Sequence, residues 1–135
     1  MPQVIVCADT SQMREEIKAG LSMLDCEFRD MSNGFEVMAG IGEEEPDLVV
    51  LDMQTGKMGG MATCMEMRLE ESGGRCGHIP VLLLVDRRPD VFLARRAQAD
   101  GFLVKPLNPV RLRRAATSLL KGGAYQDDSY LPSAL

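Results

Sequence analysis

Short runs of consecutive apolar residues alternate along the chain with longer segments in which apolar residues recur every three or four positions. Runs of the first kind are typical of strands buried on both faces, and segments of the second kind are typical of amphipathic helices. The pattern therefore predicts five strands that alternate with five helices. The predicted strands are residues 3–7, 26–29, 48–51, 79–85 and 102–104. The predicted helices are residues 11–24, 34–45, 60–71, 89–98 and 109–121.

The helical spacing also predicts which side chains face the core. In the third predicted helix, Met61, Met65 and Leu69 recur four residues apart and fall on one face. Core packing explains these methionines better than the binding of a soft metal ion.

Strands that alternate with helices through short connections favour right-handed crossovers and a parallel sheet. The sequence therefore predicts an α/β fold, a doubly wound five-stranded parallel sheet with helices on both faces, as in flavodoxin-like (βα)5 proteins. This domain is expected to span residues 1–121. Residues 122–135 show no periodicity and are expected to be a flexible tail or a linker.

Length and composition fit a single domain, since the chain has 135 residues of which 45% are hydrophobic. No apolar stretch approaches the roughly 18–20 residues of a membrane span, and the start of the chain does not resemble a signal peptide. We therefore expect a cytoplasmic protein without membrane contact. The four cysteines form no C-x-x-C pair and the sole histidine, His78, has no ligand-like neighbour in the sequence. Buried, reduced thiols are expected, and a zinc site is not.

Charge is unevenly distributed along the chain. Residues 1–74 carry 15 acidic and 5 basic side chains, whereas residues 75–135 carry 5 acidic and 10 basic ones. Two functional surfaces on one domain explain this asymmetry. Chance clustering on a solvated surface is the alternative.

Three charged residues follow three of the predicted strands. Asp9 follows the first strand, Asp52 ends the apolar run of the third, and Lys105 follows the fifth. The carboxyl ends of central strands converge on one crevice in a doubly wound sheet, so these side chains are expected to meet. Paired carboxylates with a loop carbonyl bind a hard cation such as Mg²⁺, a lysine neutralises a phosphoryl group, and an aspartate can itself be phosphorylated. Taken alone, Asp52 is equally explained as a turn residue.

The sequence resembles the receiver domain of two-component response regulators over about residues 3–121. The resemblance rests on PDLVVLDMQTGKMGG around Asp52, ADGFLVKPLNP around Lys105 and CADTSQMRE around Asp9. It implies that Asp52 is the phosphoacceptor and that Lys105 binds the phosphoryl group. It also implies that Asp9, Asp52 and the backbone carbonyl of Gln54 bind Mg²⁺, and that the peptide bond from Lys105 to Pro106 is cis.

The chain departs from that family pattern at two positions. Receivers usually carry two acidic residues after the first strand, and the first of them is Ala8 here, so weak Mg²⁺ binding is expected. The Ser or Thr that follows the fourth strand in the family is Val85, which has no donor for a phosphoryl oxygen. A hydrogen bond to a charged group is worth roughly 1.5–3 kcal/mol. Phosphorylation is therefore expected to act weakly or by another route.

Two further positions have competing interpretations. Phe102 stands at the switch aromatic position of the family, or is an ordinary core residue. Asp86 follows Val85 and could contact the phosphoryl site, but its charge would repel a phosphate, so a surface or helix-capping role is favoured.

The resemblance implies protein partners. A histidine sensor kinase or a phosphotransfer protein would supply the phosphoryl group. An output protein or a dimer mate would bind the face made of the fourth helix, the fifth strand and the fifth helix. The candidate contacts there are the arginines Arg95, Arg96, Arg111 and Arg114. Nucleic-acid binding is not favoured, because the chain is acidic overall and poor in aromatic residues.

Three functions remain open at the level of sequence. The first is an atypical, single-domain receiver that is a phosphorylation switch and not an enzyme. The second is a pseudo-receiver, a binding module that works without phosphorylation. The third is a hydrolase that forms an aspartyl phosphate, which is disfavoured because Gln54 replaces its general acid and no cap segment is present.

Overall fold

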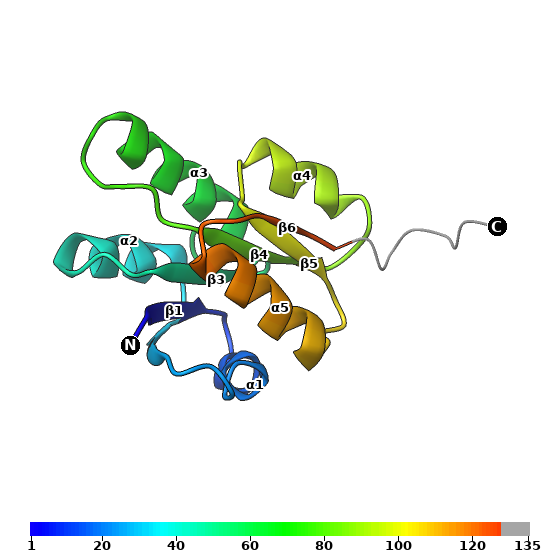
Figure 1. The fold of residues 1–135 in the computed structure, drawn as a ribbon. Coiled ribbons are helices and arrows are strands. Elements are labelled where there is room, and N and C mark those ends of the chain that lie inside the picture. The colour runs from blue at the N-terminus through cyan, green and yellow to red at the C-terminus, as the bar shows by residue number, and fades with distance from the viewer. Residues whose placement is uncertain (128–135) are drawn as a thin grey trace.

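The computed structural model describes residues 1–127, which form a parallel sheet of six strands flanked by five helices (Figure 1). The strands are β1 (Gln3–Cys7), β2 (Glu27–Met31), β3 (Leu48–Asp52), β4 (Val81–Val85), β5 (Gly101–Val104) and β6 (Tyr125–Gln126). The helices are α1 (Ser11–Gly20), α2 (Gly34–Glu43), α3 (Gly60–Ser72), α4 (Asp90–Arg96) and α5 (Pro109–Leu120).

The sheet order is β2-β1-β3-β4-β5-β6, with every neighbouring pair parallel. The first five strands follow the flavodoxin-like order, so the predicted doubly wound fold is confirmed. Helices α1 and α5 cover one face of the sheet, and α2, α3 and α4 cover the other (Figure 1). The order change between β1 and β3 leaves the carboxyl ends of these two central strands open.

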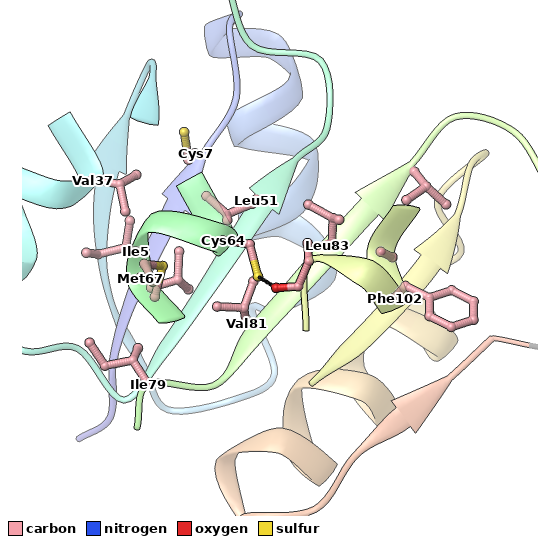
Figure 2. Packing of buried hydrophobic residues seen from close by; sticks show 14 of the residues in the cluster. Ile5, Cys7, Val37, Leu51, Cys64, Met67, Ile79, Val81, Leu83 and Phe102 are labelled. Atoms are coloured by element: carbon pink, nitrogen blue, oxygen red, sulfur yellow. Dashed lines mark hydrogen bonds between the residues drawn. The ribbon is translucent and has the colours of Figure 1, made fainter. Parts of the chain in front are cut away.

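Each central strand supplies the core on both faces. In β3, Val49 and Leu51 belong to the cluster under α2, α3 and α4, whereas Leu48 and Val50 belong to the cluster under α1 and α5. This alternation follows from the two-residue period of a strand, and it explains why β3 reads as one apolar run. Figure 2 shows the first cluster, with Cys7 and Cys64 among its side chains.

The cysteine prediction holds for two of the four thiols. All four cysteines are unpaired; Cys7 and Cys64 are buried, whereas Cys26 and Cys76 are partly exposed. Burial raises the pKa of Cys7 to about 12 and that of Cys64 to about 11, so both thiols stay protonated.

The predicted inward face of α3 is wrong for Met65 and Leu69, whereas Met61 is partly buried against the core cluster. Met65 and Leu69 are exposed, and the buried residues of this helix are Gly60, Thr63, Cys64 and Met67. Gly60 sets this face, because a Cβ atom there would lie 2.6 Å from the carbonyl oxygen of Asp52. The close approach of α3 to the end of β3 therefore selects the face that carries Gly60, Cys64 and Met67 instead of the face that carries Met65 and Leu69.

A short sixth strand corrects the predicted tail. Strand β6 pairs with β5, which places Tyr125 beside Gly101. The hydroxyl of Ser118 donates to the carbonyl of Ala124 over 2.9 Å, and the N–H of Val104 donates to the Asp127 carboxylate over 2.9 Å. The ordered chain thus continues past residue 121, and β5 is not an edge strand. The rest of the predicted tail, residues 128–135, lies outside the described residues.

Candidate functional site

Asp52 occupies the carboxyl end of the central strand β3, and its side chain is buried. Its Oδ1 atom accepts a hydrogen bond from Nζ of Lys105 over 2.7 Å and another from the backbone N–H of Gln54 over 3.0 Å. Lys105 follows β5, so the parallel sheet brings together two residues that lie 53 positions apart in the chain. The predicted meeting of Asp52 and Lys105 is confirmed.

Asp9 follows β1, the neighbour of β3, and reaches the same end of the sheet. Its Oδ1 atom accepts a hydrogen bond of 2.6 Å from the backbone N–H of Gly56. Gly56 belongs to the loop between β3 and α3, residues 53–59. Asp9 is therefore joined to the loop that starts directly after Asp52.

Asp86 joins this group of side chains, although the sequence favoured a surface or helix-capping role for it. Nζ of Lys105 lies 2.8 Å from Oδ1 of Asp86, so one ammonium group bridges two carboxylates. The favoured capping role is wrong for this residue, because no side chain caps the start of α4 and the Asp86 carboxylate pairs with Lys105 instead. The position of Asp86 directly after β4 was the available signal, since Asp9 and Asp52 were identified by their positions at strand ends.

The ion pairs of Lys105 stabilise the charged forms of both Lys105 and Asp86. Partial burial lowers the pKa of Lys105, but its hydrogen bonds to Asp52 and Asp86 outweigh burial and leave the pKa above its ordinary value. Burial raises the pKa of Asp86, whereas its hydrogen bonds with Lys105 and Gln54 lower it more, so the net pKa is below its ordinary value. At neutral pH Lys105 is a cation and Asp86 an anion.

The oxygen atoms at this end of the sheet fit a hard cation such as Mg²⁺. The carboxylates of Asp9 and Asp52 and the carbonyl of Gln54 are the donors that Mg²⁺ prefers. Within residues 1–127, no three acidic, histidine or cysteine side chains gather around one point where they could hold a metal ion. A cation here would therefore have two carboxylate ligands and would complete its shell with carbonyl and water oxygens.

The two altered positions are both fully buried. Ala8 packs in the cluster under α1 and α5, and its carbonyl accepts a hydrogen bond of 2.6 Å from Nη1 of Arg14. Val85 packs in the opposite cluster, and its carbonyl accepts a hydrogen bond from the N–H of Lys105. The peptide bond from Lys105 to Pro106 is cis, as the resemblance implied.

Phe102 is buried at the side of its cluster (Figure 2). The guanidinium carbon of Arg95 lies 5.9 Å from the centre of its ring, a cation–π distance. Phe102 therefore connects the core to the exposed face of α4. Its burial supports the core interpretation, and the switch role stays a prediction.

The arginines predicted to form an interface are exposed on helices α4 and α5. Arg95 and Arg96 are exposed on α4, and Arg111 and Arg114 are exposed on α5. Strand β6 adds to this face, because it lies beside β5 between α4 and α5 (Figure 1). A partner that binds there would meet β6 as well as β5.

A second group of charged side chains lies at the amino end of β4, away from Asp52. His78 Nδ1 is 2.9 Å from the Glu71 carboxylate, and His78 Nε2 is 2.6 Å from that of Asp100. Arg68 also pairs with Asp100 and donates to the carbonyls of Ile79 and Gln98. These residues join α3 to the starts of β4 and β5, and Glu71 and Asp100 are the partners of His78 that its sequence neighbours did not reveal.

The sequence is similar to one family model and to several curated regulatory proteins. The family model described as "Response regulator receiver domain" matches residues 4–117. The "Probable transcriptional regulator ycf27" of Cyanophora paradoxa is 30% identical over 121 residues, which cover 88% of this chain and 48% of that protein. The "DNA-binding dual master transcriptional regulator RpaA" of Synechocystis sp. is 25% identical, with 90% and 50% covered. The chain thus spans about half the length of these curated relatives.

Solved structures of response regulators share this fold. A putative response regulator from Chloroflexus aurantiacus superposes with a TM-score of 0.81 at 20% identity, covering 89% of this chain and 98% of that one. The signal receiver domain of the putative response regulator NarL from Mycobacterium tuberculosis has a TM-score of 0.77 at 25% identity, with 90% and 97% covered.

In the part of the chain that the structure describes, no helix has the length and apolar character needed to cross a membrane.

Proposed function

This chain belongs to the response regulator receiver domain family, and we propose that it is a two-component phosphorylation switch whose phosphoacceptor is Asp52. The observation that carries this proposal is the 2.7 Å contact between the Asp52 carboxylate and Nζ of Lys105 at the carboxyl end of β3. A buried nucleophile beside a fixed ammonium group is suited to receive a dianionic phosphoryl group.

The reaction transfers one phosphoryl group. A carboxylate oxygen of Asp52 attacks the phosphorus atom of the donor and forms a new P–O bond. The bond between phosphorus and the donor breaks, and the donor group leaves with the electron pair. Lys105 is placed to donate a hydrogen bond to a phosphoryl oxygen, which offsets the charge that gathers there.

We assign Mg²⁺ binding to Asp9, Asp52 and the carbonyl of Gln54. A bound Mg²⁺ neutralises phosphoryl oxygens as charge develops on them. Asp9 has a second task, since its hydrogen bond with Gly56 holds the loop after β3 near the nucleophile. With Ala8 in place of a third carboxylate, the affinity for the cation is expected to be low.

We propose one protein partner that donates the phosphoryl group and another that receives the signal. A histidine sensor kinase or a phosphotransfer protein would be the donor, with an imidazole as the leaving group. The output would pass through the face formed by α4, β5 and α5 with its exposed arginines. The net charge of −5 does not favour direct binding of nucleic acid by this domain.

The proposal is tested by incubating the protein with Mg²⁺ and acetyl phosphate and recording its intact mass. We expect the mass of one phosphoryl group to be added to the wild type and to Asp25→Asn, which removes an exposed carboxylate at the amino end of β2. Asp52→Asn should gain nothing. Equal labelling of Asp52→Asn, or none of the wild type under conditions that label another receiver, would overturn the proposal.

A pseudo-receiver is the second candidate, favoured by the two altered positions. Val85 offers no hydroxyl, and Lys105 is already paired with Asp86 as well as Asp52. This candidate predicts the same affinity for a protein partner in the wild type, Asp52→Asn and Asp52→Glu. A difference in affinity among the three proteins would exclude it.

A further inference from the structure

Lys105 makes two ion pairs of nearly equal length. Its Nζ atom lies 2.7 Å from Oδ1 of Asp52 and 2.8 Å from Oδ1 of Asp86. An ammonium group has three donors, so two are used by these carboxylates. Both carboxylates are largely shielded from solvent, with side-chain exposures of 6% and 27%, and that of Lys105 is 18%.

The two carboxylates belong to different structural elements. Asp52 ends β3, whereas Asp86 is the first residue after β4 and begins the loop that leads to α4. In that loop, the N–H of Arg87 donates to the carboxylate of Asp90, the first residue of α4. The position of Asp86 is thereby coupled through a short, hydrogen-bonded loop to the start of α4.

Phosphorylation changes the charge balance around this lysine. A phosphoryl group at Asp52 would carry about two negative charges and three acceptor oxygens. It would compete with Asp86 for the one ammonium group, and it would repel the Asp86 carboxylate. Both effects favour the separation of the Asp86 carboxylate from Lys105.

We propose that Asp86 is a positioning residue for Lys105 and that phosphorylation of Asp52 displaces it, so that Lys105 exchanges Asp86 for a phosphoryl oxygen. The inference rests on the proposed phosphorylation of Asp52 and describes how that site is regulated. It has two consequences. Asp86 lowers the affinity of the resting site for a phosphoryl group, and its release carries the signal to α4 without the hydroxyl that Val85 lacks.

The first consequence is tested by the affinity for beryllofluoride, a phosphoryl mimic, in the presence of Mg²⁺. Asp86→Asn and Asp86→Ala should bind it more tightly than the wild type, by about fivefold for a partly exposed ion pair. Asp86→Glu keeps the charge and should stay near the wild type. Asp25→Asn makes the same change in net charge away from the site, and should also stay near the wild type.

The second consequence is tested by hydrogen exchange of the α4 amides, Asp90–Arg96, with and without beryllofluoride. We expect the mimic to change this exchange in the wild type and in Asp86→Glu, but to change it little in Asp86→Ala. A change that persists in Asp86→Ala would overturn the signalling role.

The possible failures are distinct. If the wild type binds beryllofluoride and Asp86→Asn and Asp86→Ala bind it equally or less tightly, the role of Asp86 is overturned while the proposed function stands. If neither the wild type nor any Asp86 variant binds it, although circular dichroism shows folded proteins, the proposed function is overturned together with this inference.

Discussion

The backbone N–H of Lys105 donates a hydrogen bond of 2.9 Å to the carbonyl oxygen of Val85. Strands β4 and β5 are parallel neighbours, and this bond extends their pairing by one residue beyond Val104. Val85, which lacks the hydroxyl found in the family, is therefore hydrogen-bonded through its backbone to Lys105. A hydroxyl introduced at position 85 would therefore lie on a residue paired directly with Lys105.

Val85→Thr should restore a donor at this position at a cost in stability. Val85 is fully buried, so we expect the hydroxyl to lower the free energy of unfolding by about 1–3 kcal/mol. Urea denaturation measures this loss. The affinity for beryllofluoride should rise on the order of tenfold, as for one hydrogen bond to a charged group.

Val81→Thr is the matched control for that change, because Val81 is also fully buried and begins the same strand. It should lose similar stability and leave the affinity for beryllofluoride unchanged. Equal affinities of Val85→Thr and the wild type would contradict the prediction.

The strands and the site could be predicted from the sequence because both follow from short-range patterns. A parallel strand buried on both faces reads as one apolar run, and the residue after each run must lie at the carboxyl edge of the sheet. Asp9, Asp52 and Lys105 were identified in this way. Asp86 obeys the same rule, but the repulsion between its carboxylate and a phosphate argues against this position until the ion pair with Lys105 is seen.

The errors arose where tertiary contacts decide the outcome. The buried face of α3 depends on how closely Gly60 approaches the carbonyl of Asp52, which helical spacing does not encode. Strand β6 has two residues, too few for any periodicity, and its position depends on hydrogen bonds from Ser118 and to Asp127. Such features require the folded chain.

Asp9→Asn should weaken Mg²⁺ binding by at least about tenfold, because one of two carboxylate ligands loses its charge. The backbone amide of Gly56 should also change, since its acceptor is the Asp9 carboxylate. A Mg²⁺ titration followed by amide NMR spectra reports both effects. With Asp25→Asn as the control, an unchanged Mg²⁺ affinity in Asp9→Asn would remove Asp9 from the cation site.

His78 should make stability depend on pH. Partial burial lowers the pKa of His78, but its hydrogen bonds with Asp100 and Glu71 outweigh burial and the nearby charge of Arg68, so the pKa lies above 6.5. A raised pKa in the folded state means that the protonated ring stabilises the protein. This contribution is complete below about pH 6.5 and is lost as the pH rises through the folded-state pKa.

The variant His78→Gln tests this dependence by urea denaturation at about pH 5.5 and about pH 9. The wild type should exceed the variant in stability by more at the lower pH than at the higher one. The ring is half exposed, so the difference should be modest. A stability difference that does not vary with pH would show that the proton on His78 contributes nothing.

Gly34 should be the glycine on which the loop after β3 most depends. Its N–H donates to the carbonyls of Lys57 and Met58, and a Cβ atom there would lie 2.0 Å from Oγ1 of Thr63 and 2.6 Å from the Met58 carbonyl. Gly34→Ala must displace this loop, and we expect a loss of about 2–3 kcal/mol in urea denaturation, together with weaker beryllofluoride binding. Gly42→Ala in the same helix meets no atom within 4 Å and should gain about 0.5–1 kcal/mol. Because both variants add one methyl group to α2, an equal effect of the two on stability would show that the close contact between Gly34 and the loop does not stabilise the fold.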